Sequence, residues 1–271
     1  MARQTPVLVD LKPSGSGYME DLHDAGGLVR ILDALGDLID KDAMTVSGQT
    51  LGTELARYKA DWPQTIVRTP EDPLFAEGGL AVLYGNLAPD GAIIKVAAAN
   101  PLLLKHQGRA VVFEDMADLA AWIDSPDLDV AAEDILVLRN IGPKGAPGMP
   151  EAGLIPIPRK LARQGVKDMV RISDGRMSGT AAGTIILHVA PEAAVGGTLG
   201  VVKTGDIISL NVDERRLELL LSDKDIEARR KEMPPKPIEA PRGYAHLFHN
   251  TVMQAPDGVD FDFMRADPKK K

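Results

Sequence analysis

The sequence predicts an α/β protein with a β-barrel-like core, flanking helices and a helical segment that precedes the core. Two observations carry this prediction. Apolar residues recur at helical spacing in about the first 60 residues, whereas from about residue 78 short β-type runs are punctuated by glycine. About nine short strands with few helices between them favour a barrel-like sheet with helices packed outside it. A hydrophobic content of 44% is sufficient to build its core.

The first part of the chain is expected to be helical. Its helical runs are residues 18–25, which Gly26 and Gly27 end, then 28–38 and 50–58. A proline-rich, charged stretch at residues 62–73 is the expected boundary. We therefore expect three parts: a helical segment over residues 1–64, a β-barrel-like domain over 65–225, and a helical, proline-rich tail over 226–271.

The strands of the barrel are predicted from apolar and β-branched runs that glycine or polar residues bound. The runs are residues 80–84, 92–96, 108–113, 134–138, 168–172, 183–189, 200–203, 206–212 and 216–221. Helices are expected between some of them, at residues 116–123 and 158–164. After Ser222 the pattern becomes helical and polar.

Charge and composition exclude several classes of protein. The net charge of −8 argues against a nucleic-acid surface, which needs clustered Lys and Arg, and the basic run Lys269 to Lys271 is expected to be a solvated tail. No apolar stretch approaches the roughly 20 residues that a membrane helix needs, and no signal-peptide pattern is present. We expect a cytoplasmic protein. The chain has no cysteine, so it offers no disulfide and no thiolate ligand for an iron–sulfur cluster.

The first candidate site is the segment Arg139 to Glu151, which follows an apolar strand. It contains three glycines and three prolines within nine residues, a composition that fixes a loop while leaving backbone amides accessible. Glu151 follows directly and can supply an oxygen ligand to Mg²⁺. The alternative is an ordinary Pro/Gly turn between a strand and a helix.

The second candidate site is the segment Arg171 to Thr180, again after an apolar strand. Ser178 lies between Met177 and Gly179, a setting in which backbone amides and a metal can lower the pKa of a serine hydroxyl and make it a nucleophile or a base. The segment lacks the nucleophile-elbow pattern, because Arg176 occupies the position that needs glycine. A serine that caps a helix or a turn is the alternative.

Two further side chains have structural explanations from the sequence. His188 lies in a strand, where a hydrogen-bonded core histidine is favoured over a catalytic one. Lys95 ends an apolar strand and could face a cleft, but a surface lysine with a buried stem is favoured. The histidines show no metal-ligand spacing.

Together these segments resemble the dihydroxy-acid dehydratase and phosphogluconate dehydratase family over nearly the whole chain. The residues that carry the resemblance are Asp10 to Gly15 with Met19 to His23, Gly85 to Gly91, Gly142 to Glu151, Ser173 to Thr180, His188 to Ala193, and Gly205-Asp206. The closing stretch, from Arg242 to Phe248 and from Asp260 to Met264, is similar to the sugar-acid branch, which includes arabinonate and xylonate dehydratases.

The resemblance implies a hydro-lyase that dehydrates a 2,3-dihydroxy sugar acid to a 2-keto-3-deoxy acid. It implies Mg²⁺ and an Fe–S cluster as cofactors, with Glu151 at the position of a Mg²⁺ ligand and Ser178 at that of the catalytic base. It also implies that the barrel is similar to the swivelling domain of aconitases. We expect the strands that end near Leu138 and Ile172 to bring both side chains to one rim of this barrel.

The chain departs from the family in its length and in its lack of cysteine. Family members are roughly twice as long, and the half without a counterpart here holds the cluster ligands. We therefore expect a C-terminal part that is inactive alone and that forms a homo-oligomer or pairs with a complementary amino-terminal half. The alternatives are a non-catalytic module that binds a small acid, a dihydroxy-acid dehydratase of branched-chain amino-acid synthesis, or a remnant without a present role.

Overall fold

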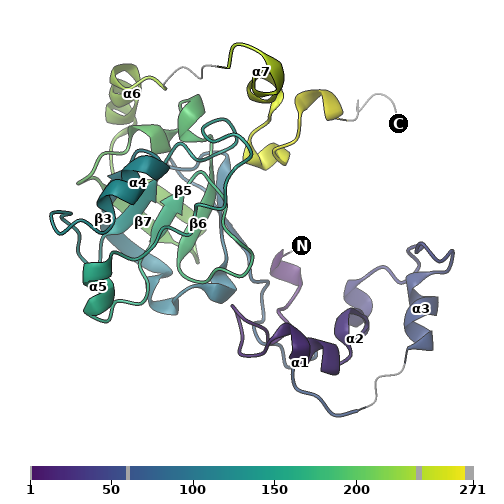
Figure 1. Ribbon diagram of the computed structural model, residues 1–271. Coiled ribbons are helices and arrows are strands. Elements are labelled where there is room, and N and C mark those ends of the chain that lie inside the picture. Colours follow the sequence, from purple (N-terminus) through teal and green to yellow (C-terminus); the bar gives the residue numbers. More distant parts are fainter. Residues whose placement is uncertain (1, 59–61, 236–239, 266–271) are drawn as a thin grey trace. The chain divides into compact units, whose positions relative to one another are not determined.

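The computed structural model describes residues 2–58, 62–235 and 240–265 (Figure 1). The chain divides into two compact units, Met1–Leu80 and Ala81–Lys271, and each is described by itself. The basic run at residues 269–271 and part of the proline-rich tail lie outside the described residues. Among the described residues, none of the helices has the length and apolar composition that crossing a bilayer requires.

The first unit is helical, as predicted. Its helices are α1 (Met19–Asp24), α2 (Gly27–Leu35) and α3 (Leu51–Arg57), with 3-10 turns η1 (Ala2–Gln4) and η2 (Gly36–Leu38). Gly26 follows α1 with φ 112°, a conformation that glycine adopts without a steric penalty. The side chain of Thr50 accepts a hydrogen bond from the backbone N–H of Thr53 and so caps the start of α3.

The second unit is a mixed sheet nearly closed into a barrel, which confirms the predicted α/β class. In the described part of the chain its strands are β1 (Ala81–Leu83), β2 (Gly91–Ile94), β3 (Lys105–Phe113), β4 (Ile135–Leu138), β5 (Arg171–Ser173), β6 (Ile185–Ala190), β7 (Ile207–Asn211) and β8 (Arg216–Leu219). Their order in the sheet is β1-β2-β6-β5-β4-β3-β7-β8. The two edges meet where Tyr84, after β1, pairs with Arg216 of β8.

The parallel strands at the centre of the sheet are β3, β4, β5 and β6, and the other pairs are antiparallel. All four residues of β4 are buried, and they alternate between two hydrophobic clusters. Ile135 and Val137 belong to the larger cluster, whereas Leu136 and Leu138 pack in a second one beneath α4 and α5. A strand that is buried on both faces reads as a continuous apolar run, and such runs made these strands predictable.

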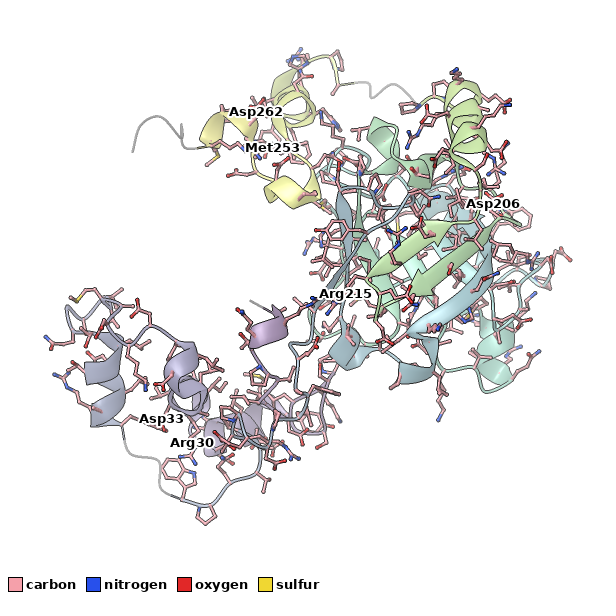
Figure 2. The ribbon with its side chains drawn as sticks, turned by 180° about the vertical axis from the view of Figure 1, so that it is seen from behind. Arg30, Asp33, Asp206, Arg215, Met253 and Asp262 are labelled. Carbon is pink, nitrogen blue, oxygen red and sulfur yellow. The ribbon has the colours of Figure 1, made fainter. Side chains whose placement is uncertain are left out.

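Helices that pack on the outside of the barrel are α4 (Met116–Trp122), α5 (Arg159–Arg163) and α6 (Asp223–Glu232). A further helix, α7 (Gly243–Thr251), has no buried residue. The 3-10 turns of this unit are η3 (Val96–Ala98), η4 (Pro101–Leu103), η5 (Ala193–Val195), η6 (Thr198–Val201), η7 (Ala255–Asp257) and η8 (Asp262–Met264). Arg229 of α6 forms an ion pair with Asp206, which is labelled in Figure 2, and so ties this helix to the barrel.

One predicted strand is wrong. The strand predicted at residues 200–203 rests on an apolar pattern that is too short to distinguish a strand from a helical turn. The 3-10 turn η6 occupies the first half of this stretch. The backbone N–H of Gly200 bonds to the carbonyl of Gly197, and that of Val202 bonds to the carbonyl of Leu199. These local bonds satisfy backbone groups that a strand would have paired with a neighbour.

Candidate functional site

Two adjacent parallel strands place the two candidate loops side by side. In the register of β4 and β5, Leu138 pairs with Ser173, so both strands end at the same edge of the sheet. The glycine–proline loop, residues 139–155, leaves β4, and the serine loop, residues 174–183, leaves β5. Loops that leave the carboxyl ends of neighbouring parallel strands share one edge of the sheet, a usual place for functional groups.

Arg176 joins the two loops. Its Nε donates to the carbonyl of Met149 at 2.6 Å, and its Nη1 donates to Oε1 of Glu151 at 2.9 Å. The backbone N–H of Gly153 donates to the carbonyl of Arg176 at 2.7 Å. The side chains of Arg176 and Glu151 are 45% and 49% exposed, so this pair faces solvent and can also face a ligand.

Ser178 lies two residues beyond Arg176 and is partly buried. Its hydroxyl is 3.1 Å from Oγ1 of Thr180, and its carbonyl accepts a hydrogen bond from the N–H of Ala181 at 3.1 Å. Ser178 therefore begins a tight turn. The structure thus brings the loops of Glu151 and Ser178 into contact through Arg176, but the two side chains do not form a direct hydrogen bond with each other among the contacts described.

Lys95, directly after β2, contacts the same turn. Its Nζ donates to the carbonyl of Gly179 at 2.5 Å and lies 3.4 Å from the carbonyl of Ala181. Burial lowers the pKa of the Lys95 ammonium. The sequence favoured a surface lysine with a buried stem, and the half-exposed side chain also places its ammonium against the serine loop.

The buried carboxylate of Asp174 connects three loops that follow strands of the barrel. Sequence analysis did not identify this residue as part of the site. Its carboxylate accepts hydrogen bonds from the backbone N–H groups of Asn140, Ile141 and Ala193 at 3.0–3.2 Å. Burial raises the pKa of Asp174 to about 6, against the opposing effect of these hydrogen bonds, and the nearby charge of Glu192 raises it further.

Glu192 is a second buried carboxylate that shapes the glycine–proline loop. It accepts hydrogen bonds from the N–H groups of Lys144 and Gly145 and from the side-chain amide of Gln254. A Cβ at Gly142 would lie 2.6 Å from Oε2 of Glu192, so only glycine fits at that position. Asp174 and Glu192 thus bind the backbone of residues 140–145 from both sides.

Several residues other than glycine in and beside these loops have positive φ angles. Asn140, Met149 and His188 have positive φ angles of 61°, 43° and 54°, a region that costs a residue other than glycine about 1–3 kcal/mol. Such residues persist where the surroundings fix them, and they are frequent at functional sites. Met149 is also the residue whose carbonyl accepts from Arg176.

His188 lies at an irregularity where β2 pairs with β6. The register of the two strands shifts between Gly91 and Ile93, and the N–H of His188 turns to the carbonyl of Gly175. The buried Nδ1 of His188 has no hydrogen-bond partner among the described residues, so the expected hydrogen-bonded core histidine is not observed at this atom. Burial, with a smaller effect of the Arg176 charge, lowers the pKa of His188 and favours its neutral form.

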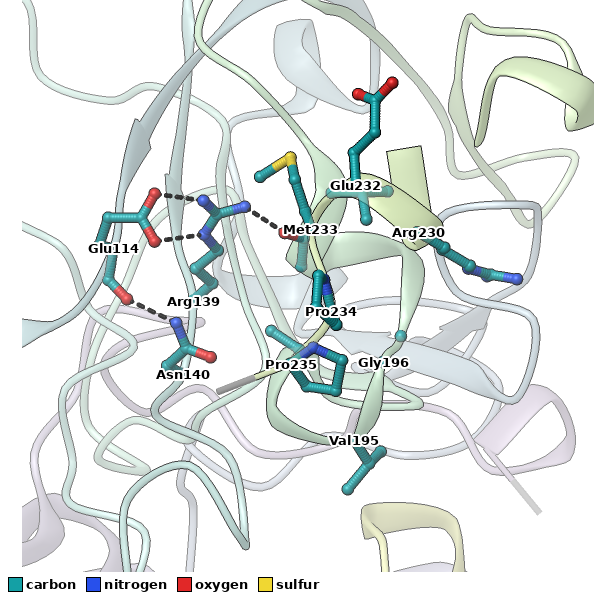
Figure 3. Close-up of a pocket in the computed structure, with 14 residues that line it drawn as sticks. Glu114, Arg139, Asn140, Val195, Gly196, Arg230, Glu232, Met233, Pro234 and Pro235 are labelled. Atoms are coloured by element: carbon teal, nitrogen blue, oxygen red, sulfur yellow. Dashed lines mark hydrogen bonds and ion pairs between the residues drawn. The ribbon is translucent and has the colours of Figure 1, made fainter. Parts of the chain in front are cut away.

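A pocket of about 650 Å³ lies beside the start of the glycine–proline loop (Figure 3). Arg139 in its wall forms an ion pair with Glu114 and donates to the carbonyls of Gly200 and Val202, so this guanidinium is bound by the protein itself. Figure 3 also shows the Asn140 amide donating to the Glu114 carbonyl. Glu151 and Ser178 are not among the residues that line this pocket. The candidate site is therefore formed by the contacts between the two loops and not by this pocket.

The donors present fit the two implied cofactors differently. Glu151 offers one half-exposed carboxylate that already attracts a cation, namely Arg176, so it fits one ligand position of a Mg²⁺ site. Within the described ranges no three His, Asp or Glu side chains gather around a possible metal position. Mg²⁺ usually binds one or two carboxylates together with water and substrate oxygens. Thiolate ligation of an Fe–S cluster does not fit, because the chain contains no cysteine.

The chain is similar to dehydratases of known families. Residues 65–259 match the dihydroxy-acid/6-phosphogluconate dehydratase C-terminal model, and residues 1–54 match the corresponding N-terminal model. An L-arabinonate dehydratase of Rhizobium leguminosarum bv. trifolii is 48% identical over 97% of this chain and 46% of its own length. A 6-deoxy-6-sulfo-D-gluconate dehydratase of Pseudomonas putida is 46% identical over 98% of this chain and 46% of its own.

A dihydroxy-acid dehydratase of Syntrophobacter fumaroxidans is 40% identical over 96% of this chain and 46% of its own length. The chain therefore spans about half the length of the curated relatives that it matches.

Proposed function

Because the chain belongs to the dihydroxy-acid/6-phosphogluconate dehydratase family, we propose that it supplies the C-terminal part of the active site of a sugar-acid dehydratase. This hydro-lyase removes the C2 hydrogen and the C3 hydroxyl of a 2,3-dihydroxy acid as water, and the resulting enol tautomerises to a 2-keto-3-deoxy acid. The sugar-acid substrate is supported by three relatives at 46–48% identity that are named for sugar acids, whereas dihydroxy-acid dehydratases match at 38–40%.

The observation that carries the proposal is the contact of the two loops through Arg176. One guanidinium touches the loop of Glu151 at two points, and the backbone of the same arginine leads directly to Ser178. A carboxylate for a cation and a hydroxyl for proton transfer are thereby held on one edge of the sheet. Without this contact each residue would be explained by its local turn alone.

In this proposal Ser178 is the base that takes the C2 proton of the substrate. A serine hydroxyl is far too weak an acid to ionise near neutral pH unless nearby positive charge stabilises the alkoxide. Arg176 and Lys95 place two such charges around the serine loop. Glu151 is the Mg²⁺ ligand of this half, and Mg²⁺, when bound, supplies positive charge at the acid group of the substrate.

We further propose that this chain is inactive without a cysteine-bearing amino-terminal half. The family's Fe–S cluster needs thiolates that this chain lacks, so no step of the reaction is assigned to a cluster held by its residues. The helical unit offers a surface for such a partner. Leu28, Met44 and Val46 are large apolar side chains with 67%, 70% and full exposure there.

The test is co-expression of this chain with the cysteine-bearing amino-terminal half of a family dehydratase, followed by an assay for 2-keto acid formation from a panel of aldonic acids. We expect activity that depends on both halves and that Ser178→Ala lowers by about 10²–10⁴-fold. Ser209→Ala, on β7 and outside both loops, is the matched control and should retain activity. Full activity of the Ser178→Ala variant, co-expressed with the cysteine-bearing half, would refute the assignment of Ser178 as the base.

A further inference from the structure

The turn that begins at Ser178 is held by one backbone hydrogen bond and one contact between hydroxyl groups within the loop. The N–H of Ala181 bonds to the carbonyl of Ser178, and the Ser178 hydroxyl meets that of Thr180. Gly179 and Thr180 are exposed, and a Cβ at Gly179 would meet no atom within 4 Å. The position of the Ser178 hydroxyl therefore depends on what holds the turn from outside.

Lys95 and the residues after it provide that support. The Lys95 ammonium contacts the carbonyls of Gly179 and Ala181, which flank the exposed Thr180. Three residues further along, the carbonyl of Ala98 accepts the N–H of Gly183 at 2.8 Å. The chain that leaves β2 thus runs along the second half of the serine loop and binds it at three points.

These contacts complement those of Arg176. Arg176 binds the part of the serine loop that precedes Ser178 to the glycine–proline loop, whereas Lys95 binds the part that follows Ser178 to the end of β2. Arg176 belongs to the serine loop itself, whereas Lys95 follows β2, and the two cations hold the segments before and after Ser178. A charge-assisted hydrogen bond from a partly desolvated ammonium is stronger than a neutral one, so Lys95 contributes more than an ordinary turn contact.

We propose that Lys95 is a positioning residue for Ser178: its ammonium fixes the turn of residues 178–181 through the carbonyls of Gly179 and Ala181 and places a positive charge one residue from the reacting hydroxyl. This inference rests on the role of Ser178 in the proposed function. It predicts that Lys95 acts through the turn and its charge, and not by contact with the substrate.

The first experiment needs no catalytic activity. Backbone amide hydrogen exchange is measured by mass spectrometry on the full chain alone, as wild type and as Lys95→Met, Lys95→Arg and Lys224→Met. Lys224 is an exposed lysine of α6 and serves as the control. Lys95→Met should raise the exchange rates of the Ala181 and Gly183 amides by about tenfold, since it removes a hydrogen-bonded charge. Lys95→Arg should restore most of the protection, and Lys224→Met should leave it unchanged.

The second experiment uses the same variants paired with the cysteine-bearing half. Lys95→Met should lower kcat by about tenfold or more while KM changes by less than about threefold, and Lys95→Arg should recover most of kcat. Unchanged exchange in Lys95→Met, or a loss confined to KM, would overturn the inference. The two failures are separable, because a loosened turn in Lys95→Met together with full activity in Ser178→Ala would refute the proposed function and leave the structural role of Lys95 intact.

Discussion

The buried carboxylate of Asp174 makes the stability of the barrel depend on pH in a direction that can be calculated. Its pKa is about 6 in the folded chain and 3.8 in the reference state. Between these values the folded chain binds more protons than the unfolded chain, so the free energy of unfolding falls as pH rises from about 4 to about 6. At 1.36 kcal/mol per unit, the shift of about two units corresponds to roughly 3 kcal/mol as an upper limit. The stabilisation that the protonated Asp174 provides is fully present below pH 4 and is lost above pH 6.

Asp174→Asn removes the titration and keeps the shape of the side chain. From pH 4 to pH 7 the wild type should lose up to about 3 kcal/mol of unfolding free energy through Asp174, whereas the variant should not. The stability of the variant relative to the wild type should therefore rise by up to about 3 kcal/mol over this range. The variant also loses acceptors, because the Oδ2 position receives the N–H groups of Asn140 and Ala193. Each buried donor left without a partner costs about 1–3 kcal/mol, an offset that does not vary with pH.

The assay is urea unfolding at a series of pH values, followed by the fluorescence of Trp122 on α4. The two units can unfold separately, so Trp62→Phe is the background that makes this signal report on the barrel alone. Asp127→Asn, at an exposed loop carboxylate, is the control and should follow the wild type at every pH. If the difference in unfolding free energy between Asp174→Asn and the wild type stays constant from pH 4 to pH 7, Asp174 does not titrate with a raised pKa in the folded chain.

Three further substitutions test how the loops are held. Gly142→Ala should destabilise the barrel by about 1–3 kcal/mol in urea unfolding, because its Cβ would lie 2.6 Å from Glu192, whereas Gly179→Ala, which meets no neighbour, should be close to neutral. Arg171→Met should cost about 3–5 kcal/mol, because it leaves the Asp168 carboxylate without its ion-pair partner and frees the carbonyls of Leu154 and Ile155; equal stability to wild type would contradict this. Arg176→Gln should cost less than about 1 kcal/mol, since its ion pair is half-exposed, yet it should speed amide exchange over residues 149–153, and unchanged exchange there would argue against the joining of the loops.

The sequence predicts the strands and loops that carry the site better than it predicts the side chains that hold those loops in place. An apolar run between polar residues identified β4, because a strand buried on both faces leaves a continuous hydrophobic pattern. β5 was predicted from the mixed run at residues 168–172, although its own residues include Arg171 and Ser173. The loops after them stand out by their glycine, proline and polar content. Their contact follows once the two strands are known to be parallel neighbours, and that pairing becomes visible only in the structure.

The residues that hold the loops could not be found in this way. Asp174 and Glu192 act through backbone N–H groups that are distant in sequence, and such acceptor–donor pairs leave no pattern of residue types. An acid directly after a buried strand was the available signal for Asp174. Lys95 gave no signal either, because a lysine at the end of a strand normally reaches solvent, and its partners are carbonyls about 85 residues away.

A double-mutant cycle on kcat tests whether Glu151 and Ser178 form one site. Ser178→Ala, Glu151→Gln and the double variant are each paired with the cysteine-bearing half and assayed for 2-keto acid formation. If the two side chains serve the same transition state, the double variant should lose little more activity than Ser178→Ala alone, since residues that act as a unit are strongly non-additive. If the two losses multiply independently, or if activity survives both substitutions, the two side chains do not act at one site.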